Sequence, residues 1–130
     1  MIEDNTVPEL LTAELQTLSA NGAILRLAGE IDMASVHVLA DQLEIASNSG
    51  WSSFVIDLSN VTFMDSVGLH ALKEGKRLIH EHDIEIVLVT SPQVRRLFEL
   101  VFPKPIFAAR VDSMEEALRF LGRDENPDDE

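Results

Sequence analysis

Asp65 and Ser66 are the residues of this chain whose types and position could do chemistry. They lie in "FMDSVGL", residues 63 to 69, where an apolar strand pattern gives way to a helical one. A serine on such a turn is the nucleophile of α/β-hydrolases when it sits in G-x-S-x-G, because small residues on both sides permit a strained turn. Here Met64 occupies the first glycine position and only Gly68 fits the second, so the hydrolase motif is half present.

A hydrolase also needs a histidine that takes the serine proton. The candidates are His37, His70, His80 and His82. His70 could share a helical face with Ser66, but an i, i+4 pair lies one above the other and lacks an evident third partner, so a surface histidine is the better interpretation. His80 and His82 flank Glu81 as metal ligands could, yet two clustered histidines without a second ligand group do not predict a metal site.

The expected start of a helix near Ser66 offers two further roles. Unpaired amides and the positive end of the helix dipole can hold an anion there, and Gly68 leaves the backbone open to close approach. Alternatively, Asp65 or Ser66 merely caps the helix by accepting an N–H bond, which stabilises by about 1 kcal/mol. The chain has neither the P-loop nor the dinucleotide-binding glycine pattern, so local chemistry favours the cap.

The first third of the chain predicts a hairpin and a helix. Apolar and polar residues alternate over residues 11–16, Asn21-Gly22 tolerates the positive φ of a tight turn, and "AILRLAGEI" (23–31) follows as a second strand. A helical stripe of apolar residues comes next and is closed by "SNSG". Its members are Val36, Leu39, Ala40, Leu43 and Ala46.

The middle of the chain alternates strands and helices. The continuous apolar run "FVIDL" (54–58) is typical of a central strand covered on both faces, and a helix begins near Ser66. "IEIVLVT" (84–90) is the next strand. Ser91 then predicts an N-cap, with Pro92 at the first helical position, where its missing N–H costs nothing.

The last third completes the pattern. The buried stripe of the helix after Pro92 is expected at Val94, Leu97, Phe98 and Val101. "IFAARV" (106–111) predicts a short last strand. Ser113 and Glu116 have the spacing of a capping box before a helix that stops at Gly122.

This order of elements predicts an α/β fold in one domain. Crossover helices make successive strands parallel, while the opening hairpin adds an antiparallel pair, so we expect a mixed sheet of about five strands with about four helices. The domain should span residues 8–122. Residues 1–7 are expected to form a flexible N-terminus, and residues 123–130 an acidic disordered tail.

Composition limits the classes of partner. The chain has 130 residues, 45% of them apolar, which suffices for one core, and it has no cysteine. Ten Lys and Arg against 23 Asp and Glu give a formal charge of −13, so we expect neither a nucleic acid nor a membrane partner. No signal pattern is evident and no stretch approaches roughly 18 continuous apolar residues. We therefore expect a cytoplasmic protein.

Three segments together resemble a known family. "VIDLSNVTFMDSVGL" (55–69), "LAGEID" (27–32) and "TSPQVRRLFEL" (90–100) occur in the order and at the spacing of the anti-sigma factor antagonists, the SpoIIAA-like members of the STAS domain family. The resemblance covers nearly all of residues 10–121. It implies a STAS-like fold and a regulatory module without catalytic activity or cofactor.

The resemblance also implies a switch in transcription regulation, such as a stress response. In the family, an anti-sigma factor that is itself a serine kinase phosphorylates the serine at the position of Ser66, and ATP belongs to that kinase. The unphosphorylated antagonist binds the kinase, which then releases its sigma factor, and a PP2C-type phosphatase reverses the modification. The alternative is a STAS protein-interaction or ligand-sensing module in a signalling complex that phosphorylation does not control.

The partner-binding surface is expected around Ser66. Its members are Glu30, Asp32, Met64, Asp65, Val67, Gly68 and Leu69. Asp32 and Asp65 correspond to the acids that the family places beside the serine, while Met64 could instead belong to the core. Many family members carry a second serine or threonine at the position of Val67. Because Val67 has no hydroxyl, any modification of this motif must fall on Ser66.

Overall fold

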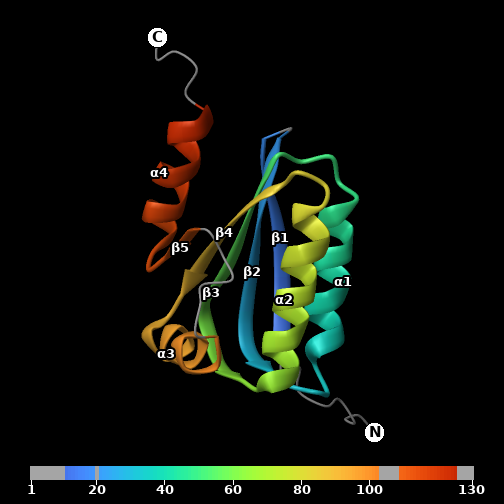
Figure 1. The fold of residues 1–130 in the computed structure, drawn as a ribbon, viewed down its shortest axis with the longest axis vertical. Helices are drawn as coiled ribbons and strands as arrows, with labels where there is room; N and C mark the ends of the chain where they lie inside the picture. Colours follow the sequence, from blue (N-terminus) through green and yellow to red (C-terminus); the bar gives the residue numbers. More distant parts are fainter. Residues whose placement is uncertain (1–10, 20, 103–108, 126–130) are drawn as a thin grey trace, which may run out of the picture.

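The protein folds into one sheet with helices on both faces (Figure 1). A computed structural model describes residues 11–19, 21–102 and 109–125. The strands in these ranges are β1 Leu11–Ser19, β2 Gly22–Ile31, β3 Ser53–Met64, β4 Glu85–Thr90 and β5 Ala109–Val111. The helices are α1 Val36–Ser47, α2 Ser66–His80, α3 Pro92–Val101 and α4 Met114–Glu125. The predicted α/β class is confirmed, with five strands and four helices in the described residues.

The sheet is mixed, as the order of elements predicted. Its strands run β1-β2-β3-β4-β5, with β1 and β2 antiparallel and every later pair parallel. Because parallel strands end at the same edge, the carboxyl ends of β2 and β3 lie side by side, with Ile31 opposite Met64. β4 ends at Thr90 opposite Leu58, so the last part of β3 extends beyond β4.

Two apolar clusters fill the space on either side of the sheet. On one side, α1, α2 and α3 pack against the strands in the larger cluster, which contains Leu39, Leu72 and Phe98. On the other side, Ala117 and Leu121 of α4 cover the outward residues of β2, β3 and β4. Figure 1 shows α1 and α2 side by side and α4 apart from them.

The start of α3 follows the sequence prediction closely. The Ser91 hydroxyl oxygen accepts a hydrogen bond from the N–H of Val94 at 3.3 Å, and Pro92 is the first helical residue. Val94 and Phe98 are buried, but Val101 is 46% exposed. The predicted stripe was therefore wrong at Val101, because the helix ends there and leaves the core.

Two other local predictions were also wrong. α4 continues to Glu125, so neither the helix nor the fold stops at Gly122, and residues 123–125 of the predicted tail are helical. Gly22 has no positive φ, although it follows the hairpin turn. A Cβ at Gly22 would lie 2.6 Å from Ser53 Oγ, so close strand contact explains this glycine. Residues 1–7, 106–108 and 126–130, which carry other predictions, lie outside the described residues.

Candidate functional site

The turn between β3 and α2 is organised by the carboxylate of Asp65. Asp65 Oδ1 accepts hydrogen bonds from the backbone N–H groups of Val67 at 3.0 Å and Gly68 at 3.2 Å. The Asp65 carbonyl accepts a third from Leu69 N–H at 3.1 Å. Of the two candidate caps, Asp65 therefore fills the role. Ser66 is the first helical residue, and its side chain is exposed.

This cap decides what the helix end can bind. The amides of Val67 and Gly68 already have the Asp65 carboxylate as acceptor, so they are not open to an incoming anion. The same carboxylate places negative charge beside Ser66. A phosphoryl group on the Ser66 oxygen would thus meet a carboxylate and solvent in place of a set of free amides.

The neighbouring turn, between β2 and α1, is organised by Asp32. Asp32 Oδ1 accepts hydrogen bonds from the N–H groups of Ala34 at 3.0 Å and Ser35 at 3.2 Å. The Ser35 hydroxyl donates to the carbonyl of Glu30 at 2.7 Å and accepts from the Asp32 N–H at 3.0 Å. Ser35 is only 5% exposed. Side-chain and backbone bonds therefore fix the whole turn.

Direct contact joins the two turns. The Asp65 N–H donates to the Ile31 carbonyl at 3.1 Å, which ties the end of β3 to the end of β2. A Cβ on Gly68 would lie 2.7 Å from Ile31 Cγ2 and 2.8 Å from Met64 Cγ. Only a glycine lets the first turn of α2 lie this close to the strand ends. The fold thus brings the predicted residues Asp32, Asp65 and Ser66 to one edge of the sheet.

The seven residues predicted around Ser66 divide by exposure. Glu30 is exposed, and Asp32, Asp65 and Val67 are partly exposed. Met64 is 4% exposed and Leu69 is 2% exposed, so both belong to the core, and Gly68 is buried as well. In the free chain the Met64 and Leu69 side chains hold the first turn of α2 against the sheet, and their part in partner binding stays a prediction.

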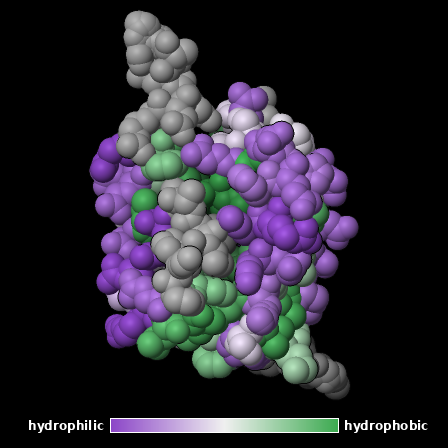
Figure 2. Space-filling model, in the orientation of Figure 1, coloured by the Kyte–Doolittle hydropathy of each residue, from purple (hydrophilic) through white to green (hydrophobic). Residues whose placement is uncertain are grey.

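Two exposed apolar side chains at this edge lie in the segments expected to form the contact surface, residues 60–70 and 30–33, but were not named as site residues. Phe63 is 49% exposed and Met33 is 77% exposed. Phe63 pairs with Glu30, and Met33 follows Asp32 in the fixed turn. Alternation from the buried Val61 would place Phe63 inside, so the linear pattern gave no signal for its exposure. Figure 2 shows apolar surface at this end of the molecule, over α3 and around the start of α2.

The enzyme alternatives gain no support from the geometry. Among the described residues, no histidine forms a hydrogen bond with the Ser66 hydroxyl, and no group of three or more possible ligands could hold a metal ion. His82 Nδ1 lies 2.9 Å from the carbonyl of Leu78 on its own helix.

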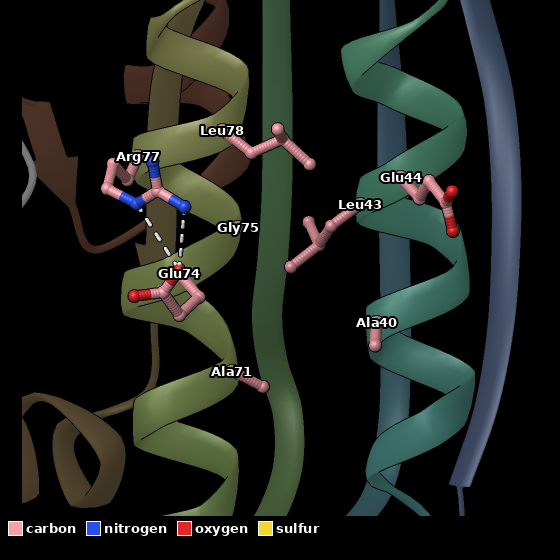
Figure 3. A pocket seen from close by; sticks show the side chains of 8 residues that line it. All are labelled: Ala40, Leu43, Glu44, Ala71, Glu74, Gly75, Arg77 and Leu78. Atoms are coloured by element: carbon pink, nitrogen blue, oxygen red, sulfur yellow. Dashed lines mark hydrogen bonds and ion pairs between the residues drawn. The ribbon is translucent and has the colours of Figure 1, made fainter.

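A pocket of about 290 Å³ opens between α1 and α2, further along α2 than Ser66 (Figure 3). Its lining residues are Ala40, Leu43, Glu44, Ala71, Glu74, Gly75, Arg77 and Leu78. The Arg77 guanidinium donates to Glu74 at 3.0 Å and to Glu81 at 2.7 Å. The hydrogen bond to Glu74, together with the charges of Glu74 and Glu81, raises the pKa of Arg77. The charge of Arg77 is therefore balanced by Glu74 of α2 and by Glu81, the residue that follows α2.

None of the helices in the described ranges is long and apolar enough to cross a bilayer.

Comparison with known proteins places this arrangement in a family. The STAS domain family matches residues 13–117. The anti-sigma-B factor antagonist of Staphylococcus aureus is 30% identical over 77 residues, which are 58% of this chain and 71% of that protein.

Solved structures share the fold. The structure of an anti-sigma factor antagonist from Mycobacterium paratuberculosis superposes with a TM-score of 0.76 at 24% identity, covering 88% of this chain and 97% of that one. The phosphorylated form of SpoIIAA, a Bacillus cell fate determinant, gives a TM-score of 0.65 at 20% identity, covering 85% and 99%. The match over residues 13–117, together with the mixed five-stranded sheet, shows that this chain belongs to the STAS domain family.

Proposed function

We propose that this protein is a cytoplasmic anti-sigma factor antagonist that phosphorylation of Ser66 switches off. In its unphosphorylated form it binds an anti-sigma factor serine kinase, which then releases its sigma factor. The observation that carries the proposal is the exposed Ser66 hydroxyl at the start of α2, beside the Asp65 cap. The similarity to the anti-sigma-B factor antagonist of Staphylococcus aureus supports the same role.

Ser66 has one chemical role in this proposal, which is to accept a phosphoryl group. Its oxygen attacks the γ-phosphorus of ATP held by the kinase, the bond from that phosphorus to ADP breaks, and the serine proton leaves to a base of the kinase. A PP2C-type phosphatase later hydrolyses the ester. This protein supplies an accessible hydroxyl on a turn fixed by hydrogen bonds, the kinase brings ATP, and each enzyme brings its own catalytic groups.

Charge is the switching variable in this proposal. Phosphorylation adds about −1.5 to −2 charges at pH 7. The amides of Val67 and Gly68 are already bonded to Asp65, so they do not neutralise that charge. In a docked interface the phosphate would have to be desolvated beside a carboxylate, which is costly. Binding weakens without refolding, because the Ser66 side chain caps nothing.

The docking surface combines acids with apolar side chains. Glu30 and Asp32 lie on the β2 side of the edge, and Met33, Phe63 and Val67 expose apolar area around them. We expect the kinase to offer cationic side chains around an apolar depression, since such a surface complements both features.

Intact-mass measurement after incubation with a cognate kinase and ATP tests the modification. We expect a mass increase of one phosphate, which Ser66→Ala abolishes. Ser59→Ala is the matched control, because Ser59 is an exposed serine of β3 whose hydroxyl already bonds Asp57 at 2.6 Å. It should leave the increase unchanged. Phosphate on any residue other than Ser66 contradicts the proposal.

Calorimetry with the same kinase tests the switch. If phosphorylation costs about 3 kcal/mol of binding free energy, affinity falls by roughly two orders of magnitude. Equal affinity of the two forms contradicts the switch. Tight binding to a signalling partner with no phosphate acceptance from any co-encoded kinase would favour the alternative, an interaction or ligand-sensing module. Val67 is the residue that favours this alternative, because many family members have a second hydroxyl at its position.

A further inference from the structure

The outer edge of β1 is a second place where this molecule can bind a partner. β1 is the first strand of the sheet, and among the residues that the structure describes no strand pairs with its outer side. Its nine residues, "LTAELQTLS", contain no lysine, arginine or proline, and Glu14 is their only charged residue. Monomeric proteins usually protect such an edge with lysine, proline or a very short strand. β1 has none of these three protections, and its one irregularity in register, between Thr17 and Ser19, lies near the end of the strand.

Apolar side chains line the same border of the molecule. Leu15 of β1 is 37% exposed, and Ile45 of α1 is 50% exposed. α1 packs over β1 and β2, whereas α2 packs over β3 and β4. At 100° per residue, Ile45 lies about 200° from Leu43, which contacts Gly75 of α2, so the two side chains are on opposite sides of α1. The Ile45 side of α1 therefore faces the β1 border.

We propose that this protein forms a homodimer in which β1 pairs antiparallel with β1 of a second copy, making one continuous sheet. This proposal does not depend on the role of Ser66. Two-fold pairing of identical strands requires that facing residues point to the same side of the sheet, so the dyad must pass through a residue position. The choice of that position is set by length and charge.

The register centred on Leu15 pairs the part of β1 before its irregularity between Thr17 and Ser19. Residues 13–17 of the two copies then face one another, with Leu15 opposite Leu15 and Glu14 opposite Gln16. A dyad at Glu14 would put two carboxylates directly opposite each other, which is destabilising. Dyads nearer either end leave part of the strand unpaired. The strand is thus complementary to itself in the register centred on Leu15.

The helices fit the same arrangement. Neighbouring strands lie about 4.8 Å apart, so α1, centred over β1 and β2, would lie about 10 Å from its copy across the dyad. Packed helices have interaxial distances of about 8–10 Å. Ile45 would then be buried in the seam above the paired Leu15 side chains.

The dimer would leave the Ser66 site open. Ser66 follows β3, two strands away from β1 in the sheet. Long-range repulsion between two chains of charge −13 opposes association, and salt screens that repulsion. We therefore expect the dimer to become tighter when salt is added.

Sedimentation equilibrium of the full chain tests the association. We expect a mass approaching twice the 14.4 kDa of one chain at high concentration, with Leu15→Lys remaining monomeric because two lysines would face each other. Leu18→Lys is the matched control: Leu18 is 40% exposed on the same strand but lies beyond the paired residues 13–17. It should stay dimeric, as should Ser66→Asp. A wild type that is monomeric at every concentration, or a dimeric Leu15→Lys, overturns the proposal.

Cross-linking tests the register and keeps the proposal falsifiable if Leu15→Lys fails to fold. The chain has no cysteine, so a single introduced one can form only an intermolecular disulfide. Leu15→Cys places two thiols directly opposite each other, about 4.5–5.5 Å apart at Cβ. Leu18→Cys places them about 20 Å apart at 3.3 Å per residue. We expect rapid dimer formation on oxidation for Leu15→Cys only. Equal rates for the two variants overturn the register.

Discussion

The two turns at the carboxyl edge of the sheet use the same residue types in opposite ways. Each begins with an aspartate whose Oδ1 accepts backbone N–H groups, Asp32 before α1 and Asp65 before α2. Each also contains a serine close behind. Ser35 is buried and bonded to its own turn, whereas Ser66 is exposed and its side chain caps nothing. The comparison shows what leaves a serine hydroxyl free for modification. At the second turn Asp65 makes the hydrogen bonds that cap the helix, so the Ser66 hydroxyl is not needed for them.

The largest effect should come from placing charge on the exposed turn. Ser66→Asp puts a carboxylate where the phosphate would be, and we expect affinity for the kinase to fall by about ten- to a hundredfold, or about 1.4–2.7 kcal/mol. His70→Asp is the control, since it adds a carboxylate at an exposed position one helical turn further along α2. Calorimetry compares both with the wild type. If Ser66→Asp binds like wild type, charge at this turn does not control docking.

Packing of the exposed turn comes next in size. Gly68→Ala would push a Cβ to 2.7 Å from Ile31 Cγ2, and both Ile31 and Met64 would have to shift. Overpacking of this kind costs about 1–3 kcal/mol of the free energy of unfolding, measured by urea denaturation. Lys73→Ala, on the exposed side of the same helix, should change it by less than about 0.5 kcal/mol. Similar stability of the two variants would mean that Gly68 does not set the position of α2.

The two serines themselves give the most direct test. Ser35→Ala removes the donor to the Glu30 carbonyl and the acceptor of the Asp32 N–H inside a buried turn, so we expect a loss of about 1–2 kcal/mol in the free energy of unfolding. Ser66→Ala should change it by less than about 0.5 kcal/mol, since nothing depends on its hydroxyl. Thermal or urea unfolding measures both. Equal losses would mean that Ser66 also does structural work.

The sequence predicted the elements around this site well because their signals are local. The Ser91 cap and the helix start at Ser66 depend on residues close together in the chain, and the parallel pairing follows from the alternation of strands and helices. Asp65 and Ser66 were both possible caps, and only the backbone geometry of the turn could decide between them. Asp65 has extended dihedral angles, which suit a residue that caps from outside the helix.

The exposure of Phe63 was harder to predict because it depends on strand register. The pairing of β2 with β3 shifts between Arg26 and Ala28 and again between Gly29 and Glu30, and these irregularities are not visible in a linear pattern. They decide that Met64 points inward and Phe63 outward. Gly22 was misread for a similar reason, since it touches Ser53, which is distant in the chain.

Neutralising either aspartate while keeping its side-chain oxygen as an acceptor should change stability little. Asparagine also caps well, so Asp32→Asn and Asp65→Asn should each keep the free energy of unfolding within about 1 kcal/mol of the wild type, with alanine costing about 1–2 kcal/mol at Asp65. The kinase should nevertheless bind or phosphorylate both asparagine variants less well, because the acidic character of the edge is lost. Urea unfolding and calorimetry on the same samples separate these effects. If Asp32→Asn loses much stability but binds normally, the role of Asp32 is only to hold its turn. Asp65 is then the acid that the partner recognises.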